Sequence, residues 1–269
     1  MPPESIVRSR QNPIYKQIRS LLRRDRRHQE RAFLVEGPRF IADAVAAGAI
    51  PSLFVLAESF ASTVDWLEIP GRSPRLMDDE LFESLTDTVT SQGVLAVFPF
   101  PIVAPRPDRA PFMLIADGVQ DPGNLGTLIR SAAGAGATQV VALSDTVDPW
   151  APKTVRAAAS AHFLVQVSVT SSVDLTSLLP AGLRLVAADA SGPERYDQCD
   201  LSGPLALIVG SEGKGISKDV LVLDPVLVSI PLESGLESLN AGVAGSILLF
   251  EASRQRRERA NRAKTPVSI

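Results

Sequence analysis

The second half of the chain alternates short apolar runs of strand length with segments of helical pattern. Apolar runs occur at residues 112–116, 139–143, 163–167, 183–188, 205–209 and 226–230. Helical patterns occupy residues 124–135 and 153–161, and a long one runs from residue 238 to about 259. Strands that alternate with helices form parallel sheets that are covered on both faces. The pattern therefore predicts an α/β fold with a parallel sheet.

A proline-rich segment separates this half from the first. Residues 99–111 contain five prolines, which favour an extended and semi-rigid linker. Before it, apolar runs near residues 32–36, 53–56 and 93–97 alternate with helical patterns at 14–27 and 40–47. We expect a loose tail at residues 1–7, a small α/β domain at 8–99, a linker at 100–111 and a second domain at 112–269.

Composition narrows the classes of function. The hydrophobic fraction is 45% and the charged fraction 21%, as in ordinary globular proteins. No run of about 18 apolar residues predicts a membrane span, and no leader is apparent, so we expect a cytoplasmic protein. Cys199 is the only cysteine, and His28 and His162 are far apart in the sequence. A metal site is therefore not expected, and Cys199 is interpreted as an idle buried thiol.

The net charge of −3 conceals a basic block. Residues 8–31 carry a net charge of +7, and the remaining residues total −10. A local basic block on an acidic protein favours contact with a polyanion, here RNA, although a solvated helix face would have the same composition. The candidate RNA-binding residues are Arg8, Arg10, Lys16, Arg19, Arg23, Arg24, Arg26, Arg27 and Arg31.

Three loops that follow strands have features of a ligand site. In residues 117–130 a strand leads into a helix that Asn124 is expected to cap, and Arg130 follows within two turns. In residues 207–216 an apolar strand enters a glycine-rich loop, which does not match a P-loop. In residues 230–240 a strand ends at Pro231 and a helix begins near Ser238, its expected cap. Taken singly, each loop is equally well explained as a capped helix or a tight turn.

In this order and spacing, the three loops resemble the signature motifs of the SpoU (TrmH-like) family of RNA 2′-O-methyltransferases. The matches are Asn-x-Gly-x-x-x-Arg at 124–130, Gly-x-Glu-Gly at 210–213, and Ile-Pro followed by Ser-Leu-Asn at 230–240. The resemblance covers about residues 111–257. Residues 8–13 and 33–37 are similar to the opening of the family's L30-like substrate-binding extension. One departure is the run Arg-Ala-Ala-Ala-Ser-Ala at 156–161, where relatives usually have a glycine.

The resemblance implies a fold and an activity that the pattern alone does not. The expected catalytic domain is an α/β sheet with a deep trefoil knot over about residues 205–250, whereas the unaided pattern gives an unknotted sheet. The knot bends S-adenosylmethionine and presents its methyl group toward the second subunit of a homodimer. The implied reaction is methylation of a ribose 2′-hydroxyl in large-subunit (23S) ribosomal RNA.

The resemblance also implies roles for individual residues. Arg130 is the expected catalytic residue, and the other residues expected to order the site are Asn124, Glu212, Ser238 and Asn240. The residues expected at the cofactor are Gly210, Ile230, Leu239, Val209, Gly213 and Leu232. Arginine is effectively always protonated. Arg130 is therefore either the base that the family description names or a cation that holds a phosphate and stabilises the developing alkoxide.

Two other functions stay open. The same motifs fit a transfer-RNA 2′-O-methyltransferase, although the L30-like first half favours ribosomal RNA. A non-catalytic RNA-binding or ribosome-assembly factor with this fold is the other alternative. The presence of Arg130, Glu212, Ser238 and Asn240 argues against it.

Overall fold

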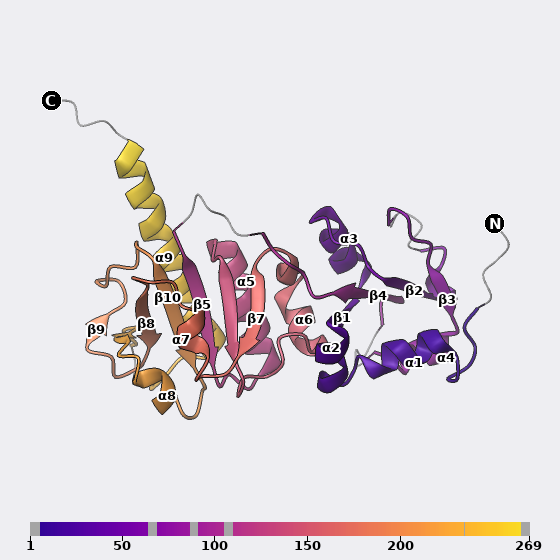
Figure 1. Cartoon of the computed structure of the whole chain (residues 1–269), viewed down its shortest axis with the longest axis horizontal. Coiled ribbons are helices and arrows are strands. Elements are labelled where there is room, and N and C mark those ends of the chain that lie inside the picture. The colour runs from indigo at the N-terminus through magenta and orange to yellow at the C-terminus, as the bar shows by residue number, and fades with distance from the viewer. Residues whose placement is uncertain (1–5, 64–68, 87–90, 105–109, 234, 265–269) are drawn as a thin grey trace. The chain divides into compact units, whose positions relative to one another are not determined.

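The protein forms two compact units in a computed structural model that describes residues 6–63, 69–86, 91–104, 110–233 and 235–264. Unit 1 comprises Met1–Ile102 and Trp150–Leu164, and unit 2 comprises Val103–Pro149 and Val165–Ile269 (Figure 1). Residues 150–164 thus pack with the first half of the chain, although the sequence division places them in the second domain. Among the helices described, none is both long enough and apolar enough to span a bilayer.

Unit 1 contains a four-stranded sheet in the order β1-β4-β2-β3. Its strands are β1 (Ala32–Glu36), β2 (Leu53–Ala57), β3 (Arg75–Met77) and β4 (Val94–Pro99). Strand β4 is antiparallel to both β1 and β2, and β3 runs parallel to β2. Its helical elements include α3 (Pro38–Ala46), η1 (Glu58–Phe60) and α4 (Asp79–Glu83). Strand β3 was not predicted, because three residues give too short a pattern.

The expected single helix over residues 14–27 is wrong, because the structure has two helices there. These are α1 (Pro13–Ser20) and α2 (Arg24–Glu30). The side chain of Arg27 is only 3% exposed, and its Nη1 donates to the carbonyl oxygen of Leu21 at 2.8 Å. Arg27 thereby satisfies a carbonyl at the end of α1 that a continuous helix would have bonded internally.

Residues 150–164 also differ from the expected pattern. Helix α6 (Pro152–Ala158) ends before the predicted Ala161, because Ala159 and Ser160 both have left-handed backbone angles, with φ of 48° and 67°. A 3-10 turn, η2 (Ala161–Phe163), follows instead of a strand. Within unit 1, Trp150 stacks on Phe100 with ring centroids 4.1 Å apart. Trp150 also contacts His162 of η2, with ring centroids 5.0 Å apart, so aromatic packing joins the two ends of the segment.

Unit 2 contains the predicted parallel sheet, which has seven strands in the order β7-β6-β5-β10-β8-β11-β9. All of its neighbouring strands are parallel. The strands are β5 (Phe112–Asp117), β6 (Gln139–Leu143), β7 (Gln166–Thr170), β8 (Arg184–Ala188), β9 (Glu194–Arg195), β10 (Leu205–Gly210) and β11 (Val226–Ser229). The near-continuous apolar strands match a sheet that is buried on both faces.

Helices cover both faces of this sheet. One face packs against α7 (Leu175–Leu178) and α8 (Lys218–Leu221), whose Leu175 and Val220 join a core with Ile115 and Ile208. Side chains alternate along a strand, so Val209 points to the opposite face. There α5 (Pro122–Ala135) and α9 (Ala241–Lys264) pack against the sheet and against each other. This pair of helices sets the position of the three loops.

Candidate active site

A cavity of about 270 Å³ lies at the carboxyl ends of β8, β10 and β11. Ligands bind at this edge in parallel α/β sheets. Loops from the second and third motifs close the cavity over the strand ends. Its lining residues are Ala188, Asp189, Ala190, Val209, Gly210, Ser211, Glu212, Gly215, Val228, Ile230, Leu232, Ser238, Leu239, Ala241 and Ala244. Gly210, Ile230 and Leu239 therefore share one cavity.

A tightly folded loop follows β10 and forms one wall. The backbone of Ser211 and that of Gly215 exchange two hydrogen bonds of 3.1 and 3.0 Å. A Cβ atom at Gly210 would lie 2.4 Å from the carbonyl carbon of Gly215, so any side chain there would collide with backbone. Gly210 is thus required by the close approach of the loop, and its position leaves backbone groups beside the cavity.

Hydrogen bonds join all three motifs. The Nδ2 of Asn240 donates to Oδ1 of Asn124 at 2.8 Å, and Nδ2 of Asn124 donates to Oε1 of Glu212. Asn240 thus positions the side chain of Asn124, and Asn124 in turn holds the carboxylate of Glu212 at the edge of the cavity that Glu212 lines. The arrangement orients Glu212 through α5 and α9 rather than through its own loop.

The two helix caps differ from the expected ones. Asp121, not Asn124, caps α5, since its side chain accepts from the backbone N–H of Asn124 at 2.8 Å. At the start of α9, Oδ1 of Asn240 accepts from the N–H of Val243 at 3.2 Å, so Asn240 takes the role assigned to Ser238. Because Asp121 and Asn240 form the caps, the side chains of Asn124 and Ser238 have other roles. Asn124 uses its side chain to bridge the motifs, and Ser238 lines the cavity.

The small residues of α9 serve packing within the chain. A Cβ atom at Gly242 would lie 3.3 Å from the Cα of Asn124, and the Oγ atoms of Ser131 and Ser246 are 2.7 Å apart. Gly245 lies against Leu128 of α5 and Val209 of β10. The close approach of α9 to α5 therefore brings Asn240 within reach of Asn124.

Four predicted site residues lie outside the cavity lining. Two of them, Asn124 and Asn240, form the hydrogen bonds that lead to Glu212, and the other two are Gly213 and Arg130. Gly213 is exposed at the tip of the loop after β10, so its expected contact with a cofactor is not supported. Arg130 is exposed on α5, and no ion pair or hydrogen bond with the described residues engages its guanidinium. The exposed cation is available to a ligand or to another copy of the chain.

Asp189 is a cavity residue that the sequence analysis missed. It directly follows β8, and its Oδ1 accepts from the N–H and Oγ of Ser191 at 2.8 and 2.6 Å. The signal was an acidic residue at the end of an apolar strand, a position where carboxylates often meet a ligand. Asp189 and Glu212 give the cavity two carboxylates among apolar walls, an arrangement suited to a cationic ligand with a flat apolar part.

Most of the basic block is exposed in unit 1. Arg8, Arg10, Lys16, Arg19, Arg23, Arg24 and Arg31 are exposed and Arg26 is partly buried. Some of these cations have acidic partners, as in Arg8 with Glu58 at 3.1 Å. Arg27 is the exception, because its buried guanidinium bonds a backbone carbonyl. We therefore remove Arg27 from the candidate RNA-binding residues.

Comparison with known proteins identifies similar families for both units. The SpoU rRNA Methylase family matches residues 111–250, and the MRM3-like substrate binding domain matches residues 12–96. Together these matches cover the strands and loops of the cavity and most of the basic block.

Individual relatives are similar over most of the chain. The mitochondrial rRNA methyltransferase 3 of Mus musculus is 32% identical over 86% of this chain and 69% of its own. RlmP of Bacillus subtilis, a 23S rRNA (guanosine(2553)-2'-O)-methyltransferase, is 31% identical over 91% of this chain and 97% of its own. The AdoMet-bound rRNA methyltransferase of Sinorhizobium meliloti superposes with a TM-score of 0.79 at 30% identity, covering 94% of this chain and 98% of its own.

Proposed function

Because the chain belongs to the SpoU rRNA methylase family, we propose that it methylates a ribose 2′-hydroxyl in large-subunit ribosomal RNA with S-adenosylmethionine as donor. One observation carries the proposal. The second and third motif loops line one cavity, and the first motif is tied to them by the hydrogen bonds from Asn240 through Asn124 to Glu212. The relatives named above act on ribosomal RNA, and one was solved with the donor bound.

The residues of the cavity fit the donor. Val209, Leu232 and Leu239 offer apolar surface for the adenine, and the strand end at Gly210 and Ile230 offers backbone groups. Asp189 and Glu212 match the positive charge that the donor carries. When bound, S-adenosylmethionine supplies an electrophilic methyl group. The ribose oxygen would accept that methyl group from the sulfonium, and the hydroxyl proton would pass to water.

Arg130 acts on the acceptor in this proposal. Its guanidinium is permanently charged, so it stabilises the developing alkoxide and holds an adjacent phosphate rather than accepting the proton. It is exposed and does not line the cavity of its own chain. We therefore place it at the cavity of a second copy, which makes the active unit a homodimer.

An apolar stripe on α9 supports this dimer. Val243 and Phe250 are 46% and 49% exposed, with Ile247 between them at helical spacing. Exposed apolar side chains in a row favour association. Phe250 lies beside Gly134 of α5, the helix that carries Arg130. A second copy that covers this stripe would therefore bring the two copies of α5 close to each other.

Unit 1 contributes contacts to the RNA. Its match to a substrate binding domain and its exposed basic block both support a role in holding RNA phosphates. The family's knot over residues 205–250 and a cytoplasmic location remain predictions. No metal is required for this chemistry.

Arg130→Ala tests the function most directly. We expect loss of methyl transfer by at least about 100-fold, as for removal of one group that stabilises an oxyanion, with unchanged affinity for S-adenosylmethionine by titration calorimetry. Arg130→Lys retains the charge but not the fork, so it should recover only part of the rate. Mapping 2′-O-methyl groups in ribosomal and transfer RNA, with and without the gene, identifies the substrate. Full turnover by Arg130→Ala would remove Arg130 from the mechanism.

A further inference from the structure

The C-terminal end of α9 is a second basic segment of the chain. Residues 254–264 read Arg-Gln-Arg-Arg-Glu-Arg-Ala-Asn-Arg-Ala-Lys, with six basic residues and one acidic residue. Their net charge is +5, whereas the other residues of unit 2 contain seven basic and sixteen acidic side chains. We refer to residues 254–264 as the basic end of α9. It gives an otherwise acidic unit one concentrated positive surface.

Over residues 254–262, the basic end of α9 does not contribute buried side chains to the core of unit 2. Up to Ser253 the helix buries side chains such as Leu248, Leu249 and Ala252, and from Arg254 to Arg262 none is fully buried. Figure 1 shows the last turns of α9 extending past the edge of the sheet. The basic end is therefore not retained for the hydrophobic core of unit 2.

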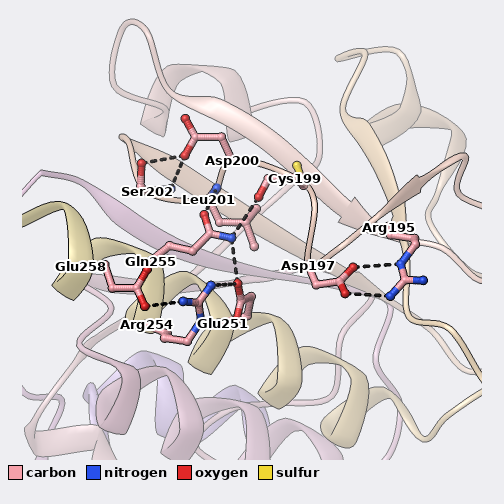
Figure 2. A network of polar contacts seen from close by, with 10 residues as sticks. All are labelled: Arg195, Asp197, Cys199, Asp200, Leu201, Ser202, Glu251, Arg254, Gln255 and Glu258. Atoms are coloured by element: carbon pink, nitrogen blue, oxygen red, sulfur yellow. Dashed lines mark hydrogen bonds and ion pairs between the residues drawn. The ribbon is translucent and has the colours of Figure 1, made fainter.

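The first turn of the basic end anchors it to the unit. Figure 2 shows Gln255 donating to the carbonyl oxygen of Cys199 at 3.0 Å and accepting from the N–H of Leu201 at 2.8 Å. Arg254 pairs with Glu251 at 2.7 Å and with Glu258, and it holds the pKa of Glu251 below its usual range. These bonds fix the direction in which the helix leaves the sheet.

Arg256 completes the anchor. Its guanidinium donates to the carbonyl oxygens of Gly203 and Ala110 and lies over the ring of Phe112, 4.9 Å from the centroid. Arg254 and Arg256 are thus occupied by contacts within the unit. Neither charge is well placed for an external partner.

The remaining arginines that the structure describes form no ion pair with a carboxylate. Arg257 and Arg259 donate only to the hydroxyls of Ser253 and Ser202, at 2.8 and 3.2 Å. All three of Arg257, Arg259 and Arg262 are exposed, and no carboxylate among the described residues forms an ion pair with them. Arg259 and Arg262 are three residues apart, so they share a helix face. The helix thus presents three exposed cations without ion pairs, of which Arg259 also interacts at longer range with the carboxylate of Asp200.

We propose that Arg257, Arg259 and Arg262 contact phosphates of the RNA substrate, as a surface separate from the basic block of unit 1. The proposal rests on the proposed function. RNA fits better than an anionic membrane, because the only apolar residues of the basic end are alanines and membrane-bound helices need an apolar face. The anchored base of the helix holds these cations in a fixed direction, which reduces the entropy lost on binding.

Helix stability alone does not explain the charge. Cations near a helix C-terminus are favourable by about 0.3–1 kcal/mol because of the dipole, an effect confined to the last turn. Arg257 and Arg259 lie before that turn. Helix stability also does not explain why Arg254 forms two ion pairs whereas Arg257, Arg259 and Arg262 form none with the described residues.

The test compares two triple variants of the full-length chain. One replaces Arg257, Arg259 and Arg262 by glutamine, and the other replaces them by lysine and keeps the charge. Binding of in vitro transcribed, protein-free large-subunit ribosomal RNA is measured by filter retention over a potassium chloride series. Each lost phosphate contact lowers the salt slope by about 0.7–0.9, so the glutamine variant should lose about 2 from the slope and at least tenfold in affinity. The lysine variant should stay close to the wild type.

Two controls separate this proposal from its alternatives. The variant Lys218→Gln removes an exposed charge of the same unit from α8, which packs on the other face of the sheet from α9, and it should change the slope little. Calorimetric binding of S-adenosylmethionine and methyl transfer by the wild type at saturating RNA report the proposed function independently. A glutamine variant with wild-type affinity and slope would overturn the proposal even if the wild type methylates RNA. Arginine-dependent sedimentation with phosphatidylglycerol vesicles, without an effect on RNA binding, would also overturn it.

Discussion

Gly245 offers a sharp test of how α9 is held against the site. A Cβ atom at this position would lie 2.3 Å from Cδ2 of Leu128 and 2.9 Å from Cγ2 of Val209. Overpacking of this kind costs about 1–3 kcal/mol. The same Gly→Ala change in a helix interior gains about 1 kcal/mol. We therefore expect Gly245→Ala to lose about 0–2 kcal/mol of the free energy of unfolding.

Gly134→Ala on α5 is the matched control. A Cβ atom there would meet only Cζ of Phe250, at 3.5 Å, which is ordinary contact distance. The substitution should therefore gain up to about 1 kcal/mol from helix propensity. The two variants share chemistry, secondary structure and unit, and they should differ by about 1–3 kcal/mol in opposite directions.

Urea denaturation followed by far-ultraviolet circular dichroism measures the difference between the two variants. Titration with S-adenosylmethionine adds a second readout, because Val209 lines the cavity and must move in Gly245→Ala but not in Gly134→Ala. The expected result is weaker donor binding only in Gly245→Ala. Equal shifts of stability in both variants, or a more stable Gly245→Ala, would refute the packing argument.

Two further predictions concern unit 2. Asp189→Asn should weaken S-adenosylmethionine binding by about tenfold, which is the scale of one charge-assisted hydrogen bond. Calorimetry on the folded variant measures this affinity. Asp174→Asn, which lies away from the cavity, is the control. Burial raises the pKa of the Cys199 thiol from 9.0 to about 11, so iodoacetamide should alkylate the native protein slowly at pH 8, and Gln255→Ala should speed alkylation by freeing the Cys199 backbone. Because the folded thiol holds its proton more tightly, its contribution to stability is present below about pH 9 and is lost as pH rises toward 11, which a comparison with Cys199→Ala detects.

The parallel sheet was predictable because its signal is local. The central strands of unit 2 bury both faces and read as apolar runs, as at Leu205–Gly210. The sequence analysis failed where a contact between distant residues decides the local structure. The break between α1 and α2 depends on the buried guanidinium of Arg27, and the turn that ends α6 packs His162 against Trp150. Helical periodicity contains no information about either contact.

The site illustrates the same limit at longer range. Its three motifs were recognisable from their order and spacing, but the contacts among them follow from the sheet topology. Strand β10 lies between β5 and β8, so the loop after β10 faces the helix after β5, although 88 residues separate Asn124 from Glu212. If the strands of the sheet followed chain order, β5 would be an edge strand that pairs only with β6. Strand β10 would then lie farther from β5, and Glu212 would be too distant to bond Asn124. The hydrogen bonds of Asn124 are therefore a consequence of strand order. A substitution at Asn124 removes contacts that this topology creates, as well as a polar group of the site.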